Sequence, residues 1–266
     1  MTATAATREN ITDILCIGAQ KASTSWLHHV LNAHPRTHSF PNSRPVTSTN
    51  KEAHFWDWNR KRGGDWYRAL MTPKDPARLS MDFTPEYSTL PEPDIAECKA
   101  LNPGARVIYV LRDPLARAVS AIRMHTKWRS DDAAADALRV GFDADFLALL
   151  KRAGVAAQSS YVANFQRWAK HYDDILVLSY EDIRADPHAV IARVFAHCGL
   201  SLDDMHAEAR AEFDTRMARR VWASVPYTLE PEALWFLHGL THPKREAAEA
   251  FFNLRFNEHR EVLKTA

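Results

Sequence analysis

The sequence predicts an α/β fold in a single domain, with a parallel β-sheet flanked by helices on both faces. Short apolar runs at 14–17, 106–111 and 175–179 have the length and composition of buried strands. Helical patterns occupy stretches between them, at 25–33 and 161–171. Because strands and helices alternate along the chain, we expect the strands to pair in parallel and to bind ligands beyond their carboxyl ends.

The remaining segments fit this arrangement. Residues 1–12 are small and polar and predict a flexible tail, which leaves 13–266 as one folded domain of ordinary size. Ser, Thr, Asn and Pro dominate residues 36–50, and this composition predicts a loop. A short strand is expected at 79–83, and the chain from Glu232 onward is predicted to be mostly helical.

Composition and charge exclude several classes of protein. The formal net charge of +1 provides no overall field, so neither nucleic acid nor an anionic membrane is expected as a partner. No apolar run approaches the ~20 residues that span a bilayer, so no membrane span is expected. The three cysteines, Cys16, Cys98 and Cys198, form no CxxC pair and indicate reduced thiols in a cytoplasmic protein. The 13 histidines show no HxH or HExxH spacing, so no metal is expected.

The stretch GAQKASTSWL, from Gly18 to Leu27, joins the first predicted strand to the first predicted helix. A helix N-terminus has unpaired N–H groups and the positive end of a dipole, so this junction suits a phosphate. The nucleotide-triphosphate loop GxxxxGK(S/T) needs a glycine directly before its lysine, whereas Gln20 precedes Lys21 here. The sequence therefore predicts a P-loop-like anion site that differs from a triphosphatase loop. A generic loop with a surface lysine remains the alternative.

The same residues resemble the 5′-phosphosulfate loop of the sulfotransferase family, whose usual form is close to QKxGT(T/S)WL. Enzymes of this family use 3′-phosphoadenosine 5′-phosphosulfate (PAPS) as the sulfuryl donor. The match departs at one position, where Ser23 replaces the usual glycine. The resemblance implies that Lys21 lies at the phosphosulfate and that Trp26 stacks on the adenine. It implies a donor-binding set made of Lys21, Ala22, Ser23, Thr24, Ser25 and Trp26.

A second stretch, RVIYVLRDPLARAVS at 106–120, resembles the 3′-phosphate motif LRDPxxRAxS of the same family. Arg112 follows the strand's carboxyl end, where its planar fork suits phosphate oxygens, and Ser120 adds a hydroxyl two turns into the helix. The resemblance implies that both bind the donor's 3′-phosphate. The alternative is an arginine that forms an ion pair at a strand end. Further along, Arg219 and Arg220 are candidates for another phosphate contact.

A third stretch, KEAHFWD at 51–57, contains a carboxylate and an imidazole two residues apart. In an extended segment Glu52 and His54 share a face, which makes them a candidate base with its orienting partner. The string resembles KExHF(F/W)D of heparan-sulfate-type sulfotransferases, in which the glutamate deprotonates the acceptor; a solvated strand edge is the alternative. Phe83 stands where those enzymes often have a lysine, which argues against their polysaccharide specificity. Candidates to stack on the acceptor are Trp56, Trp58, Trp66 and Trp128.

The three motifs together imply a PAPS-dependent sulfotransferase, with 13–266 as its sulfotransferase domain. Expected catalytic residues are Glu52, Lys21 and His54. The donor would be converted to adenosine 3′,5′-bisphosphate (PAP), and the acceptor would be a hydroxyl of a sugar, lipid head group or small alcohol. Two alternatives stay open. A P-loop-type kinase or NTPase would use Lys21 on a triphosphate and Asp82 as a magnesium ligand, and a non-catalytic module would only bind the nucleotide.

Overall fold

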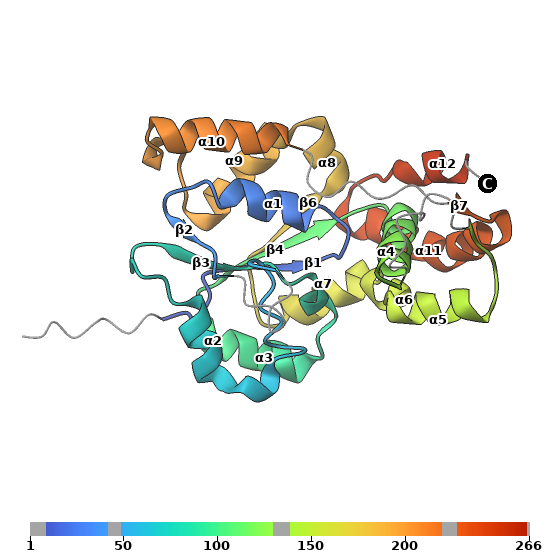
Figure 1. Ribbon diagram of the computed structural model, residues 1–266, viewed down its shortest axis with the longest axis horizontal. Coiled ribbons are helices and arrows are strands. Elements are labelled where there is room, and N and C mark those ends of the chain that lie inside the picture. Colours follow the sequence, from blue (N-terminus) through green and yellow to red (C-terminus); the bar gives the residue numbers. More distant parts are fainter. Residues whose placement is uncertain (1–8, 42–48, 130–138, 220–227, 265–266) are drawn as a thin grey trace, which may run out of the picture.

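The computed structural model describes residues 9–41, 49–129, 139–219 and 228–264 (Figure 1). Residues 1–8 of the expected tail lie outside the described residues. Ile11 and Thr12 are buried, and the Thr12 N–H donates to Asn102 Oδ1 at 2.7 Å. The packed part of the chain therefore begins slightly before residue 13.

A five-stranded parallel sheet forms the centre of the molecule, in the order β2-β3-β1-β4-β6. The apolar runs predicted as strands are confirmed, because each is long enough to cross the core and each is bounded by polar or turn residues. The expectation of a loop throughout 36–50 is wrong at one place, where two residues pair with β3 as an edge strand. The strands are β1 (Ile14–Gly18), β2 (Thr37–His38), β3 (Leu79–Asp82), β4 (Arg106–Leu111) and β6 (Ile175–Ser179).

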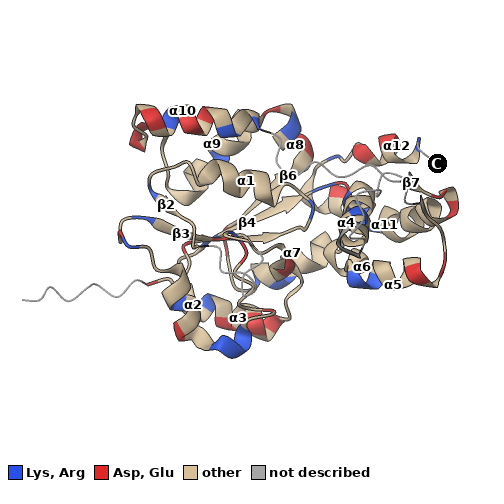
Figure 2. Ribbon diagram, in the orientation of Figure 1, with Lys and Arg blue, Asp and Glu red and all other residues tan. Residues whose placement is uncertain are grey.

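Helices cover both faces of this sheet, as predicted (Figure 1). On one face lie α1 (Thr24–Leu31), α8 (Tyr180–Ala185), α9 (Pro187–Cys198) and α10 (Ala207–Ala218). The other face carries α2 (Gly63–Met71), α3 (Glu92–Leu101) and α7 (Tyr161–Ala169), with the 3-10 turns η1 (Arg60–Arg62) and η2 (Pro85–Thr89). In Figure 2, acidic and basic residues are interspersed along outer helices such as α10, in keeping with the near-neutral net charge.

A further group of helices gathers beyond the carboxyl end of β4 (Figure 1). It begins with α4, which Asp113 caps by accepting from the N–H groups of Leu115 (2.9 Å) and Ala116 (3.2 Å). This confirms the predicted helix start. The group contains α4 (Pro114–Arg129), α5 (Ala144–Arg152), α6 (Val155–Gln158), α11 (Pro231–Phe252) and α12 (Glu258–Leu263), with the short paired strands β5 (Arg139–Val140) and β7 (Thr228–Leu229).

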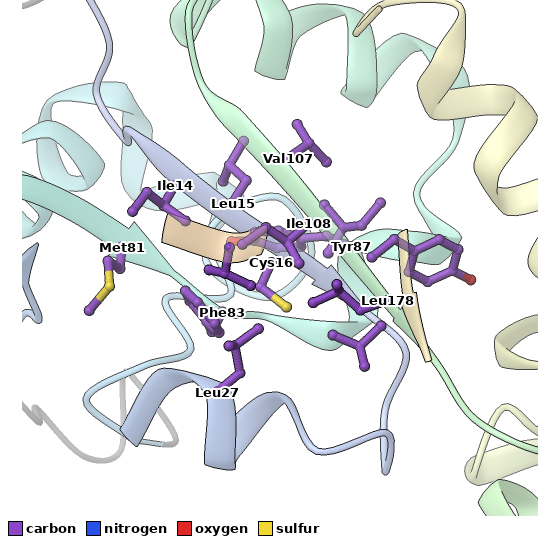
Figure 3. Packing of buried hydrophobic residues seen from close by; sticks show 14 of the residues in the cluster. Ile14, Leu15, Cys16, Leu27, Met81, Phe83, Tyr87, Val107, Ile108 and Leu178 are labelled. Atoms are coloured by element: carbon purple, nitrogen blue, oxygen red, sulfur yellow. The ribbon is translucent and has the colours of Figure 1, made fainter. Parts of the chain in front are cut away.

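The core lies between the central strands and the helices on either face (Figure 3). Leu15 of β1, Val107 of β4 and Leu27 of α1 are fully buried there. Burial of side chains of this size stabilises the fold by about 1.5–3 kcal/mol each. Cys16, Cys98 and Cys198 are all buried and free. Within the described residues, no helix combines the length and apolarity needed to cross a membrane.

Candidate functional site

The loop after β1 has the backbone of a phosphate-binding turn. Gly18 has a φ of 141°, and a Cβ built there would lie 2.7 Å from the Pro85 carbonyl oxygen, so only glycine fits. Ser23 is the N-cap of α1 with a φ of 71°, and Lys21 has a φ of 68°, both in the left-handed region that glycine adopts most easily. Ser23 thus has a left-handed backbone at the position where the related motif has glycine. Its side chain makes no capping hydrogen bond to α1.

The Lys21 side chain carries its charge in a crowded, positive environment. Burial lowers the pKa of its ammonium, and the nearby charges of Arg112 and Lys51 lower it further. No carboxylate among the described residues pairs with this ammonium. The main-chain carbonyl of Lys21 accepts a hydrogen bond from Arg112 Nη1 at 2.9 Å. The two predicted phosphate motifs therefore meet, although nothing in the loop itself indicates this contact.

Arg112 lies directly beyond the end of β4, as predicted, and its guanidinium is held on several sides. Its Nε and Nη2 donate to the two carboxylate oxygens of Glu258 at 2.7 and 3.0 Å. The guanidinium also lies over the Tyr180 ring, 4.4 Å from its centroid. The Tyr161 hydroxyl donates to the Arg112 carbonyl at 2.7 Å, which gives this buried tyrosine a structural role. The ion pair with Glu258 is the alternative that the sequence left open, and the structure contains it.

Arg112 and Ser120 line one cavity of 990 Å³. The structure therefore brings the two residues of the predicted 3′-phosphate motif together. Other basic side chains on its wall are Arg123, Arg184 and Arg260. Of the C-terminal candidates, Arg219 follows the end of α10 and Arg220 lies outside the described residues.

Glu181, an acidic residue of α8, also lines this cavity. It caps neither neighbouring helix, because Ser179 caps α8 and Asp186 caps α9. Burial raises the pKa of Glu181 to about 7, and the negative charges of Glu258 and Asp113 add to this effect. The cavity wall therefore carries both arginines and carboxylates. Because the pKa of Glu181 lies near 7, the protonation of this residue can change when a charged ligand binds.

The 51–57 segment forms a hydrogen-bonded cluster near Lys21, close enough for the charges of Lys51 and Glu52 to act on the pKa of the Lys21 ammonium. Glu52 Oε2 lies 3.7 Å from His54 Nε2, and His54 Nδ1 lies 2.9 Å from Asp57 Oδ2. Lys51 Nζ donates to the other oxygen of Glu52 and to the Phe83 carbonyl. Burial disfavours the charged imidazole, but hydrogen bonds to Asp57 and Glu52 outweigh it and raise the pKa of His54 to about 9. The imidazole is thus held between two carboxylates, by a hydrogen bond to Asp57 and by an ion pair with Glu52 at 3.7 Å.

The local backbone of this cluster differs from the expectation. His54 has a φ of 50°, and the segment turns there, so it is not an extended strand. Glu52 and His54 nevertheless meet, because the turn folds the chain back on itself and Asn59 N–H donates to the His54 carbonyl. The alternative of a solvated strand edge is wrong, since Lys51 and His54 are buried.

Glu86 is a residue of this cluster that sequence reasoning missed. It lies on η2, and its Oε1 accepts from Gln20 Nε2 at 2.8 Å, directly beside Lys21. Potential ligand atoms of His54, Asp57 and Glu86 lie within 4.8 Å of one another, so a cation is geometrically conceivable there. A metal ion there would have to displace the proton that the raised pKa places on His54.

Asp82, the magnesium ligand of the kinase alternative, is committed to structural contacts. It is fully buried and accepts hydrogen bonds from the hydroxyls of Thr84 (2.7 Å), Tyr67 (2.9 Å) and Tyr87 (3.0 Å), and from Ala53 N–H (3.2 Å). Four donors use the lone pairs that a metal ion would need. This observation argues against the kinase alternative.

The tryptophans that the sequence suggests for stacking on the acceptor or the adenine differ in how exposed they are. Trp58 is 60% exposed and stacks on the His54 imidazole, with ring centroids 3.5 Å apart and planes at 5°. Trp56 is buried, and Trp66 is half-buried against the core. Trp26 is only 8% exposed and packs in the core, so its stacking on adenine stays a prediction. The Trp128 side chain lies outside the described residues. Trp58 is therefore the candidate with an open face beside the cluster.

Comparison with known proteins shows that the similarity to sulfotransferases is not limited to the three motifs and covers most of the chain. The model of the sulfotransferase domain family matches residues 11–217. Human heparan sulfate glucosamine 3-O-sulfotransferase 3B1 is 27% identical over 255 residues, which cover 91% of this chain and 61% of that protein. The human bifunctional heparan sulfate N-deacetylase/N-sulfotransferase 3 is 26% identical over 270 residues, which cover 95% of this chain and 29% of that protein. The chain thus spans only part of the length of these curated relatives.

Solved structures share the fold. A sulfotransferase from Alicyclobacillus acidocaldarius superposes with a TM-score of 0.66 at 20% identity, covering 94% of this chain and 98% of the other. The mouse sulfotransferase SULT7A1, solved in complex with PAP, gives a TM-score of 0.51 at 11% identity, covering 97% of this chain and 90% of the other. These likenesses confirm the predicted α/β fold with its P-loop-like sheet.

Proposed function

The chain belongs to the sulfotransferase domain family, and from this premise we propose that it transfers a sulfuryl group from PAPS to an acceptor hydroxyl. One observation carries the proposal most directly. Arg112 and Ser120 line one cavity, and Arg112 also bonds to the main chain of the Lys21 loop. A nucleotide with phosphates at both its 3′ and 5′ positions needs two anion sites that lie next to each other.

The residues present fit such a donor. The cavity of 990 Å³ has room for a nucleotide and carries several arginines. The guanidinium of Arg112 already binds a carboxylate with two parallel hydrogen bonds, which is the geometry it would use for a phosphate. The loop N–H groups with Thr24 and Ser25 would hold the 5′-phosphate, and Arg112 and Ser120 would hold the 3′-phosphate. When bound, PAPS supplies an activated sulfuryl group.

Lys21 and Glu52 would be the protein's own catalytic groups in sulfuryl transfer. The Lys21 ammonium would oppose the negative charge that accumulates on the 5′-phosphate side during transfer, which is electrostatic stabilisation by a group already in place. Glu52 would accept the proton of the acceptor hydroxyl. Lys51 and His54 each hold one of its oxygens, so the carboxylate needs no reorientation. His54 would orient Glu52 and would itself be held by Asp57.

The acceptor would enter beside this cluster, where the Trp58 ring offers an open apolar face. Stacking on such a ring suits the apolar face of a sugar or another flat ring. The curated relatives named above act on heparan sulfate, according to their names. We propose a smaller or less anionic hydroxyl acceptor here, because Phe83 stands in place of a lysine and the acceptor side carries Asp57 and Glu86 beside Glu52.

Isothermal titration separates this proposal from its alternatives. The protein should bind PAP more tightly than adenosine 5′-monophosphate (AMP), and more tightly than ATP with or without magnesium. Arg112→Ala should weaken binding of PAP about tenfold or more while changing that of AMP little, because a charge-assisted hydrogen bond contributes roughly 1.5–3 kcal/mol. Equal affinity for PAP and AMP in the wild-type protein would overturn the donor assignment.

Catalysis is tested separately with labelled PAPS and a panel of sugars, lipids and small alcohols. Transfer of label to any of them distinguishes an enzyme from a module that only binds the nucleotide. Binding of PAP without transfer to any hydroxyl or amine in the panel would favour the binding module.

A further inference from the structure

The C-terminal helix α12 places a carboxylate on the arginine that would bind the 3′-phosphate. Glu258 is the first residue of α12, and it accepts both hydrogen bonds from Arg112, at 2.7 and 3.0 Å. The side chains of the pair are mostly buried, with 17% and 15% of their surfaces exposed. The contact joins positions 146 residues apart, and no motif in the sequence indicates it.

The helix that carries Glu258 is firmly attached. His259, the next residue, donates its main-chain N–H to Asp113 Oδ2 at 2.9 Å, and its Nδ1 lies 2.6 Å from the same oxygen. Asp113 is fully buried and also caps α4 directly after Arg112. The backbone at Glu258 is therefore held near Arg112 whether or not the two side chains touch.

A carboxylate and a phosphate compete for the same two N–H donors of a guanidinium. We propose that Glu258 is an internal competitor of the 3′-phosphate: it pairs with Arg112 in the free protein, gives way when the nucleotide binds, and lowers the affinity for donor and product. The inference rests on the proposed function, because it assigns Arg112 to the 3′-phosphate. It makes Glu258 a determinant of how strongly the 3′-phosphate is recognised.

The surroundings of Glu258 allow this exchange. Arg184 Nη1 lies 3.9 Å from Glu258 Oε1, on the wall of the same cavity, so a displaced carboxylate keeps a cationic neighbour. A phosphate carries more negative charge than a carboxylate and can also accept from Ser120, which lines the cavity. Both factors favour the phosphate over Glu258 as the partner of Arg112. Loss of the Arg112–Glu258 ion pair nevertheless makes the binding free energy of the nucleotide less favourable.

The test compares two nucleotides on matched variants. Glu258→Gln removes the competing charge, so its affinity for PAP should rise about tenfold while its affinity for AMP changes less than about twofold. Glu212→Gln is the control, because it removes the same charge from another carboxylate–arginine pair, in which Glu212 Oε1 accepts from Arg216 Nε at 2.7 Å, on a helix that does not line the cavity. Its affinity for PAP should change less than about twofold. Affinities are measured by isothermal titration at fixed salt.

Two further variants secure the result. In the double variant Arg112→Ala with Glu258→Gln, the gain should vanish, because the competition needs the arginine. Should Glu258→Gln fold poorly, Glu258→Asp is used, whose shorter side chain loses the two-bond contact and should also tighten PAP. Unchanged or weaker PAP binding by the folded Glu258 variants would overturn this inference while leaving the proposed function standing. Wild-type protein that binds PAP and AMP equally would instead overturn the proposed function.

Discussion

At the scale of single residues, the acceptor-side cluster depends on where protons reside. Glu52 lies between the Lys51 ammonium and the His54 imidazole, and Asp57 holds the far nitrogen of that imidazole. A carboxylate held in this way suits the role of proton acceptor. An imidazolium between two carboxylates suits orientation, since it has no free lone pair to take a proton.

Glu52→Gln tests the assignment of the base. The substitution preserves size and most hydrogen bonding but removes basicity, so single-turnover transfer from labelled PAPS should slow by about 10²–10⁴. Titration of PAP should remain near the wild-type value, because Glu52 does not contact the nucleotide cavity. His54→Ala should slow transfer less. Wild-type transfer by Glu52→Gln would make Glu52 structural and His54 the leading base.

The pH dependence of stability tests the state of His54. Its pKa is raised from 6.5 to about 9 in the folded protein, so its charge stabilises the fold fully below pH 6.5 and this contribution is lost as pH rises through about 9. The difference in unfolding free energy between wild type and His54→Gln should therefore be larger at pH 6 than at pH 10. Urea denaturation at both values measures it. A difference that does not change with pH would show that His54 is neutral in the fold.

At the scale of an element, the phosphate loop combines a predicted sequence with an unusual residue. Ser23 has a left-handed backbone at the N-cap of α1, where the related motif has glycine. An L-residue in this region is strained by roughly 1 kcal/mol relative to glycine. The loop shape is therefore imposed by the surrounding fold, including the close approach of Gly18 to Pro85.

Ser23→Gly should consequently leave the stability unchanged or raise it by up to about 1 kcal/mol, and should not weaken PAP binding. Ser25→Gly is the matched control, since the same change two residues later falls inside α1 and should destabilise by about 0.5–1 kcal/mol. Urea denaturation of both variants gives the comparison. Equal destabilisation by both would mean that the Ser23 side chain itself supports the loop.

At the scale of the whole molecule, the C-terminal segment completes the cavity that Arg112 and Ser120 line. Residues near the end of the chain line it together with residues of α4 and α8, and the contact between His259 and Asp113 holds them there. The cavity is therefore formed only when the chain is folded through α12. The family model matches residues 11–217, so this contribution lies beyond the matched region.

His259→Ala should lower the unfolding free energy by about 1–3 kcal/mol, because it removes a partner of a fully buried carboxylate. His242→Ala is the control: it also removes a histidine paired with a carboxylate, Glu246, but both side chains are exposed, and the change should stay within about 0.5 kcal/mol. Urea denaturation measures both. Similar small losses would mean that the contact does not hold the C-terminal segment.

The sequence predicted the parts of the site that follow from local pattern. Apolar runs located β1, β4 and β6, and the residues directly after them located Lys21 and Arg112, because ligands of a parallel sheet bind at its carboxyl edge. The conformation of 51–57 was predicted incorrectly. Its turn at His54 depends on buried contacts such as the hydrogen bond from His54 N–H to Thr84 Oγ1, which local alternation does not encode.

By itself, the sequence determined the fold class and the order of the motifs, and it predicted which residues would face a phosphate, since these depend on short-range periodicity and on the polarity of strand ends. Only the tertiary structure decided which charged groups meet. It set Glu86 beside His54, surrounded Asp82 with hydroxyl donors and brought Glu258 to Arg112. The first and the last of these contacts join residues that are distant along the chain, and both depend on how the surrounding segments pack on the sheet. Packing depends on all the side chains of the core together, so it cannot be inferred from the spacing of residues along the sequence.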